Sequence, residues 1–206
     1  MINQLLTTAQ TEKINEYYRL LLDWNKQHNL TRITKIEDFI EKNILDTVAV
    51  VSYIKNLPVT HIVDVGTGAG IPGVILAIIL PQFQWHLVDS SLKRITFLEE
   101  VKHSLSLNIT PYHCRVEQFH TQINEPIDLI ISRAVSDPVT MLKLTQALHH
   151  PDLLIYLMRA SKWELSLSTN DWATEEIPLN IPKSTLTRIL MILYQKGGTP
   201  PHFSIE

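Results

Sequence analysis

The chain has one cysteine, Cys114, among its 206 residues. A single cysteine cannot form an internal disulfide or a cysteine-based zinc site, and it favours a reducing compartment. A membrane-spanning helix needs about 20 apolar residues, and the apolar run at 71–81 is too short. The N-terminus has neither the basic segment nor the apolar segment of a secretory signal. These absences predict a cytoplasmic protein that binds no metal and crosses no membrane.

Positive charge is not in excess. The chain has 18 Lys and Arg against 21 Asp and Glu, for a net charge of −3. This balance excludes a nucleic-acid binder that is basic overall, but it allows a local basic patch, because only the contacting face meets phosphates. With 45% hydrophobic and 19% charged residues, the chain is expected to fold around a substantial core. We expect a monomer.

Hydrophobic periodicity divides the chain into two parts. Two stretches, 11–29 and 36–57, carry apolar residues at helical spacing. They predict an N-terminal helical extension over 1–57, and Pro58 is expected to end the second helix. From 58 to 206, apolar strands alternate with helices. The expected strands are 61–65, 85–89, 109–114, 127–132, 153–158 and 185–196, and the expected helices are 70–80, 91–105 and 137–150.

Strands that alternate with helices indicate an α/β fold with a parallel sheet covered on both faces. Pro111 lies within the third expected strand, which it places at a sheet edge or at the start of the strand. Asp137 followed by Pro138 is typical of a helix start, with the acid as N-cap and proline at the first helical position.

Glycine is scarce, and four of the six glycines lie in DVGTGAGIPG, residues 64–73. The stretch contains G-x-G-x-G from Gly66 and G-x-G-x-x-G from Gly68. The first pattern is typical of S-adenosylmethionine (AdoMet) loops and the second of dinucleotide loops. In both, backbone N–H groups at a helix start face a ligand that side chains do not obstruct. Asp89 ends the next strand, where an acid accepts hydrogen bonds from the ribose that both cofactors contain.

Three observations favour AdoMet over NAD. Asp64 precedes the loop, where a carboxylate suits the ammonium group of the methionine part and repels a pyrophosphate. No Lys or Arg lies between Lys55 and Lys93 to compensate a pyrophosphate. The unit begins at residue 61, whereas dinucleotide domains often open a chain. Under the AdoMet interpretation Gly73 is a packing residue, and a NAD-linked oxidoreductase is the alternative.

The motifs around the loop are specific when they are taken together. They occur in the order WNKQHNLT (24–31), DVGTGAGIPG (64–73), LVDSSLKRITFLEEV (87–101), CRVEQF (114–119) and ISRAV (131–135). Over roughly 20–167 the chain resembles the glucose-inhibited division protein B (RsmG) family of bacterial 16S rRNA guanine-N7 methyltransferases. The resemblance implies a Rossmann-like class I methyltransferase with a seven-stranded, mostly parallel sheet. It implies methylation of guanine 527, in the 530 loop of 16S rRNA or of the small ribosomal subunit, with S-adenosylhomocysteine as product.

The resemblance also implies roles for particular residues. Arg133 follows the fourth expected strand, at the edge of the sheet where α/β ligands bind, and is the predicted catalytic residue, ordering the AdoMet carboxylate or the target base. The predicted cofactor-binding residues, which include those argued from the loop, are Asp64, Gly66, Gly68, Gly70, Ile71, Asp89, Val116, Glu117 and Arg133. The predicted RNA-binding residues are Lys26, Arg32, Lys42, Arg94 and Arg159.

The residues present agree with N7 chemistry. Guanine N7 has a free lone pair and no proton, so its methylation needs placement rather than a general base. The segment after the fourth expected strand lacks the Asn/Asp-Pro-Pro-Tyr/Phe pattern of exocyclic-amine methylation. Two sites depart from the family pattern: Asn43 stands where histidine is usual, and Arg159-Ala160 where the family has Lys-Gly. A small-molecule AdoMet methyltransferase and a noncatalytic RNA-binding assembly factor are further alternatives.

Overall fold

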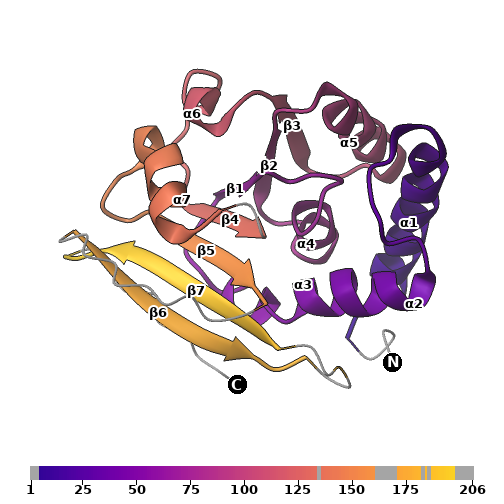
Figure 1. Cartoon of the computed structure of the whole chain (residues 1–206), viewed down its shortest axis with the longest axis horizontal. Coiled ribbons are helices and arrows are strands. Elements are labelled where there is room, and N and C mark those ends of the chain that lie inside the picture. The colour runs from indigo at the N-terminus through magenta and orange to yellow at the C-terminus, as the bar shows by residue number, and fades with distance from the viewer. Residues whose placement is uncertain (1–4, 134–135, 161–170, 182–183, 185–186, 198–206) are drawn as a thin grey trace.

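The protein folds around one seven-stranded sheet (Figure 1). The structure is a computed structural model that describes residues 5–133, 136–160, 171–181, 184 and 187–197. The strand order is β3-β2-β1-β4-β5-β7-β6, and β7 is antiparallel to both of its neighbours whereas the other pairs are parallel. The strands are β1 (His61–Val65), β2 (Gln84–Asp89), β3 (Ile109–His113), β4 (Leu129–Arg133), β5 (Leu154–Arg159), β6 (Trp172–Leu179) and β7 (Arg188–Gln195).

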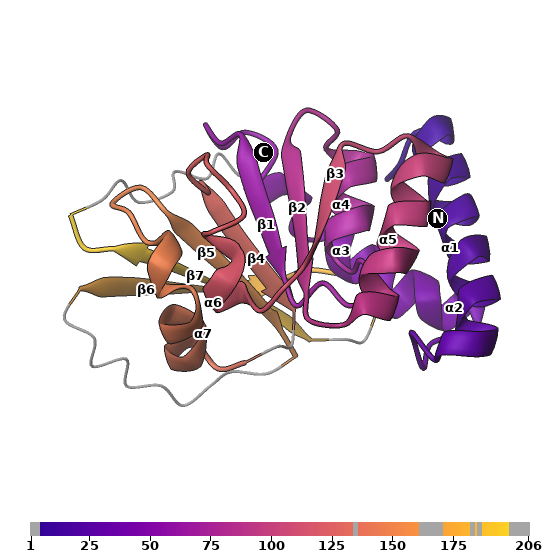
Figure 2. The same cartoon turned by 90° about the horizontal axis from the view of Figure 1, so that it is seen from above.

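Helices cover both faces of the sheet. Successive residues of β1 face opposite sides, so Ile62 joins a core with α1, α4 and α5, while Val63 joins a core with α6 and α7. Helix α1 packs on α4 and α5, outside the sheet (Figure 2). The longer helices are α1 (Thr8–His28), α4 (Gly73–Ile79), α5 (Leu92–Leu105) and α7 (Pro138–Leu144), and the short ones are α2 (Ile36–Phe39), α3 (Asp46–Val48) and α6 (Val116–Phe119).

Two local expectations, one at Pro111 and one at Asp137, are confirmed. Strand β3 is an edge strand, so Pro111 removes no hydrogen bond from the interior of the sheet. The Asp137 side chain accepts the backbone N–H of Thr140 at the start of α7, with Pro138 at the first helical position. No helix among the described residues is long and apolar enough to cross a membrane.

The single helix expected over 36–57 is wrong. Helix α2 passes into a π-helical segment, η2 (Ile40–Leu45), then into α3 and a 3₁₀ turn, η3 (Val51–Tyr53). Two causes are visible. β-Branched valines at 48, 50 and 51 are poor helix formers, and Asn43 and Asp46 turn inward to bind arginines of the sheet. π-Helical turns of this kind are frequent at functional sites.

Strand β6 has no counterpart in the expected strands. Its sequence, WATEEIPL, holds two glutamates, a threonine and a proline, and only its terminal residues Trp172 and Leu179 are buried. Because β6 is the outer strand of the sheet, most of its side chains face solvent, and Pro178 is tolerated at the edge. A search for apolar runs therefore misses it.

Candidate active site

The glycine loop leaves β1 in a conformation that side chains disfavour. Gly66, Gly68 and Gly70 have φ angles of 68°, 62° and 97°, in the left-handed region that glycine adopts readily. A Cβ at Gly70 would also lie 2.4 Å from Val74 Cγ2 and 2.8 Å from Leu98 Cδ2. Gly73 acts differently: a Cβ there would lie 2.4 Å from Leu87 Cδ2 on β2. The prediction of Gly73 as a packing residue is thus confirmed.

Asp64 anchors both ends of this loop from inside the protein. Its carboxylate is 1% exposed, and Oδ2 accepts hydrogen bonds from Thr67 Oγ1 at 2.7 Å and from the Gly73 backbone N–H at 2.8 Å. Burial raises the pKa of Asp64 to about 6, against the lowering effect of these hydrogen bonds and of the Arg133 charge. Oδ1 has no partner among the described residues. The anchoring role is absent from the sequence prediction, which gave Asp64 a ligand contact only.

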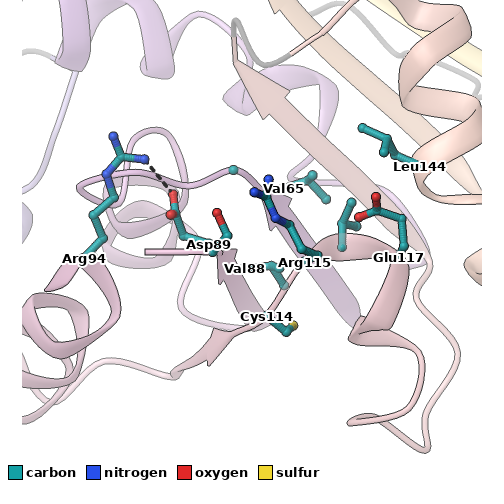
Figure 3. Close-up of a pocket in the computed structure, with 11 residues that line it drawn as sticks. Val65, Val88, Asp89, Arg94, Cys114, Arg115, Glu117 and Leu144 are labelled. Atoms are coloured by element: carbon teal, nitrogen blue, oxygen red, sulfur yellow. Dashed lines mark hydrogen bonds and ion pairs between the residues drawn. The ribbon is translucent and has the colours of Figure 1, made fainter. Parts of the chain in front are cut away.

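Asp89 ties the loop to the end of β2. Its Oδ2 accepts the Gly68 backbone N–H at 3.0 Å and Arg94 Nη1 at 3.0 Å, while Oδ1 accepts the Ser91 backbone N–H at 2.9 Å. Figure 3 shows the Arg94 contact as a dashed line beside the pocket. A carboxylate offers about four lone-pair positions, so three are used and one is left for a hydroxyl group.

A pocket of about 250 Å³ opens beside Asp89, where β1, β2 and β3 end (Figure 3). Its lining residues are Val65, Gly66, Val88, Asp89, Ser90, Arg94, Cys114, Arg115, Val116, Glu117 and Leu144. Apolar walls suit a purine face, and the buried carboxylate suits a ribose hydroxyl. The pocket therefore offers a buried acceptor and apolar walls of the kind that suit an adenosine, and we call it the adenosine pocket.

The structure divides the predicted cofactor residues into two groups. Those that line the pocket are Gly66, Asp89, Val116 and Glu117. Those that shape the loop or lie along it, without lining the pocket, are Asp64, Gly68, Gly70 and Ile71. Cys114 is buried at the pocket wall, and desolvation raises the pKa of its thiol, so the neutral thiol acts as an apolar wall atom.

Arg133 does not line this pocket. It ends β4, and its guanidinium donates to the Lys42 carbonyl at 2.8 Å, to Asp46 Oδ2 at 3.2 Å and to Asn43 Oδ1 at 3.0 Å. These contacts place it in a second cavity of about 370 Å³, with Arg159 and Arg188 also in the wall. The structure thus does not bring Arg133 together with the lining of the adenosine pocket.

The predicted RNA-binding residues are scattered. Lys26 and Arg32 are exposed, and Lys26 pairs with Asp23. Lys42 pairs with Asp38 at the second cavity, and Arg94 belongs to the adenosine pocket. Arg159 is 7% exposed and lines the second cavity, with Nη1 3.7 Å from Glu176 Oε1. Arg188, which the sequence analysis did not single out, also lines the second cavity. No cluster of His, Cys, Asp and Glu suited to a metal ion occurs in the described ranges.

Helix α1 contacts the glycine loop directly through Tyr17. The Tyr17 hydroxyl donates to the Ala69 carbonyl at 2.6 Å, and both residues are buried. Tyr17→Phe leaves this carbonyl without a donor, so we expect a loss of about 1–3 kcal/mol in the free energy of unfolding and weaker AdoMet binding. Tyr18→Phe is the matched control, because the Tyr18 hydroxyl donates to the Thr34 carbonyl at an exposed site where water can replace it. Equal losses in urea unfolding would contradict the anchoring role of Tyr17.

His86 and Asp64 give the free energy of unfolding opposite dependences on pH. His86 Nε2 lies 3.2 Å from His61 Nδ1, and burial lowers the pKa of His86 to about 4. Unfolded His86 takes up a proton below about 6.5 and folded His86 only below about 4, so stability falls across this window. At about 1.4 kcal/mol for each pH unit, the loss is about 3 kcal/mol. Asp64 has its pKa raised from 3.8 to about 6, so it adds about 3 kcal/mol as pH falls through that range.

Asp64→Asn is expected to expose the contribution of His86. In the native chain the two effects nearly cancel between pH 6.5 and 4, whereas the variant keeps only the loss from His86. Over this range the free energy of unfolding of Asp64→Asn should therefore fall by about 3 kcal/mol more than that of the native chain. Urea unfolding at successive pH values measures both curves, and parallel curves would contradict the raised pKa of Asp64.

Fold and site together define a class of protein. The antiparallel β7 between β5 and β6, the glycine loop after β1 and the acid that ends β2 are those of a class I AdoMet-dependent methyltransferase. The fold is similar to that of precorrin-6y C5,15-methyltransferase from Geobacter metallireducens, with a TM-score of 0.54 and 11% identity over 72% of this chain and 88% of that one.

The sequence comparisons identify the family. The family model of GidB, rRNA small subunit methyltransferase G, matches residues 10–190. The ribosomal RNA small subunit methyltransferase G of Francisella philomiragia is 40% identical over 192 residues, which cover 92% of this chain and 91% of that protein. The protein of the same name from Legionella pneumophila (strain Lens) is 42% identical over 164 residues, 77% of this chain and 76% of that one. The chain belongs to this family of AdoMet-dependent methyltransferases, which excludes the NAD-linked alternative.

Proposed function

We propose that the chain transfers the methyl group of AdoMet to N7 of guanine 527 in the 530 loop of 16S rRNA. The observation that carries the proposal is the family match over 10–190, which includes both the adenosine pocket and the second, basic cavity at the same edge of the sheet. We also propose that the protein acts in the cytoplasm as a monomer without a metal, and that residues 1–57 form a helical extension of the methyltransferase domain, 58–206.

In the proposed site, AdoMet supplies an electrophilic methyl group on its sulfonium. Asp89 would accept a ribose hydroxyl through its remaining acceptor position, while Val116 and Glu117 would hold the adenine. The backbone of Gly66, Gly68, Gly70 and Ile71 would give the methionine part close access to the loop. Asp64 Oδ1, buried and without a partner among the described residues, would accept from the ammonium group. Such a contact would favour the carboxylate form of Asp64 over the protonated form.

Arg133 has a positioning role in this proposal. Its guanidinium joins the end of β4 to the segment that holds Asn43 and Asp46, and so it fixes the wall that faces the acceptor. Guanine N7 carries no proton, so the site needs no general base. The rate enhancement then comes from holding N7 in line with the methyl group, an effect that can reach about 7–11 kcal/mol.

The purified protein, incubated with tritiated AdoMet and small ribosomal subunits that lack the modification, tests the proposal. We expect label in 7-methylguanosine after nuclease digestion, and none with fully methylated subunits. A metabolite extract in place of the subunits tests for a small-molecule methyltransferase. AdoMet binding without transfer to subunits or to free 16S rRNA would contradict the proposal and indicate a binding-only assembly factor.

A further inference from the structure

The second cavity lies where three strand ends meet at one edge of the sheet. Arg133 ends β4, Arg159 ends β5, and Arg188 begins β7. Because β7 runs antiparallel to β5, with Arg159 paired to Ile189, its first residue lies at the edge where β4 and β5 end. The segment that contains Asn43 and Asp46 also lines this cavity of about 370 Å³.

The charges around this cavity are mostly positive. Its lining holds four cationic side chains, those of Lys42, Arg133, Arg159 and Arg188, and one acid, Asp46. Asp38 and Glu176 lie outside the lining, where they pair with Lys42 and Arg159 respectively. Positive charges that converge in a partly enclosed space repel one another and favour an anion between them.

Asp46 holds two of these arginines in fixed positions. Its side chain is 2% exposed, Oδ1 accepts Arg188 Nε at 2.8 Å, and Oδ2 accepts Arg133 Nη1 at 3.2 Å. Arg188 Nη1 also donates to the Thr187 carbonyl at 3.0 Å. A guanidinium has five N–H groups. The contacts with Asp46 and Thr187 use two of the five in Arg188. The remaining donors are held in place for a further acceptor.

Asn43 adds a second, independent indication of a ligand. The residue is 1% exposed, and its Oδ1 accepts Arg133 Nη2 at 3.0 Å. Its Nδ2 has no hydrogen-bond partner among the described residues, although it is buried and the residue lines the cavity. Buried donors nearly always have partners in folded proteins, so a ligand with acceptor oxygens would complete this site.

We propose that this cavity binds a phosphate group of the RNA substrate next to the target guanine, and that Asp46 is a positioning residue that holds Arg188 for it. Arg188 and the Asn43 amide contact the phosphate oxygens, while Arg133 remains bound to the protein. The inference rests on the proposed function, because it assigns the acceptor side of that same site.

Arg188→Gln tests the phosphate contact, and Lys196→Gln is its matched control. Lys196 is an exposed cation that follows the opposite end of the same strand. Binding of each variant to unmethylated small subunits is measured over a series of salt concentrations. We expect Arg188→Gln to weaken binding about tenfold and to reduce the slope of log K against log salt by about 0.7–1. Arg188→Lys should retain the slope, and Lys196→Gln should leave both quantities unchanged.

Asp46→Asn distinguishes a role of Asp46 in positioning Arg188 from an effect of its negative charge on RNA binding. Removal of a negative charge near RNA would strengthen binding if only net charge mattered. A positioning role predicts the reverse, namely binding weaker by about 3- to 10-fold, because hydrogen bonds to charged groups are among the stronger ones. The AdoMet Kd and the melting temperature of Asp46→Asn show whether this variant folds. If it does not fold, the Arg188 variants alone test the inference.

Three results would overturn the inference. The first is unchanged RNA affinity and salt slope in Arg188→Gln. The second is tighter RNA binding by folded Asp46→Asn. The third is a raised AdoMet Kd in Arg188→Gln with an unchanged salt slope, which would assign the cavity to the cofactor. If the native protein still forms 7-methylguanosine, the proposed function survives each of them. If the native protein methylates no RNA, the proposed function fails and this inference with it.

Discussion

Asp89→Asn should raise the AdoMet Kd by about 10- to 150-fold. The carboxylate accepts from the Gly68 and Ser91 backbones and from Arg94, and the ribose needs the acceptor position that is left. An amide offers only one acceptor oxygen, so the variant loses at least one hydrogen bond to a charged group. Such a bond contributes about 1.5–3 kcal/mol to the binding free energy. Isothermal titration calorimetry with AdoMet measures this directly.

Arg94→Gln is the control for the ion pair alone. The Arg94 side chain is 41% exposed, and exposed ion pairs contribute about 0–1 kcal/mol. We therefore expect its AdoMet Kd to change less than about fivefold. If Asp89→Asn bound AdoMet as tightly as Arg94→Gln, the role of Asp89 as the acidic centre of the pocket would be wrong.

Gly70→Ala is expected to cause the largest loss of stability among single-methyl substitutions in the loop. Gly70 and Gly197 share a φ of 97°. A Cβ at Gly197 has no described residue within 4 Å, whereas one at Gly70 would lie 2.4 Å from Val74. Gly197→Ala should therefore cost only the backbone strain, about 1–2 kcal/mol. Gly70→Ala should cost about 1–3 kcal/mol more through overpacking.

Urea unfolding of the two alanine variants under identical conditions isolates the steric part, since the backbone strain is common to both. Gly70→Ala should also weaken AdoMet binding, because relief of the contact moves the loop, while Gly197→Ala should not. Equal stability losses, or equal AdoMet affinities, would contradict the requirement for close approach at Gly70.

The strands could be predicted where burial is complete. Strand β1 begins and ends where the pattern HIVDV does, because both faces are covered and the apolar run is unbroken apart from Asp64. Strand β6 was not predicted for the opposite reason: it is an edge strand, and it has few buried apolar residues. The prediction of one helix over 36–57 is wrong because it used only the spacing of apolar residues. Buried Asn43 and Asp46 are instead positioned by their hydrogen bonds to arginines.

The site follows the same division. The sequence could place Gly66 and Asp89 beside one pocket because a motif within one strand–loop–helix unit holds both. It could not place Arg188 beside the second cavity, because Arg188 reaches that cavity only through the antiparallel insertion of β7. The departure at Asn43 from the family's usual histidine now has a structural setting, because its Oδ1 accepts a hydrogen bond from Arg133. Contacts of this length in sequence, 90 residues apart, leave no local signal.

The N-terminal segment contacts the glycine loop and lines the second cavity. Tyr17 on α1 holds the loop carbonyl of Ala69, and the segment with Asn43 and Asp46 holds Arg133. The predicted helical extension thus shares a core with the sheet and supports the geometry of the glycine loop as well as the wall of the second cavity.

The central claim is tested most directly by mapping 7-methylguanosine in 16S rRNA from cells with and without this protein. We predict full modification at guanine 527 in its presence, loss of the modification at this position alone in its absence, and restoration by the native gene but not by the Asp89→Asn variant. An unchanged 7-methylguanosine map in cells that lack the protein would contradict the account.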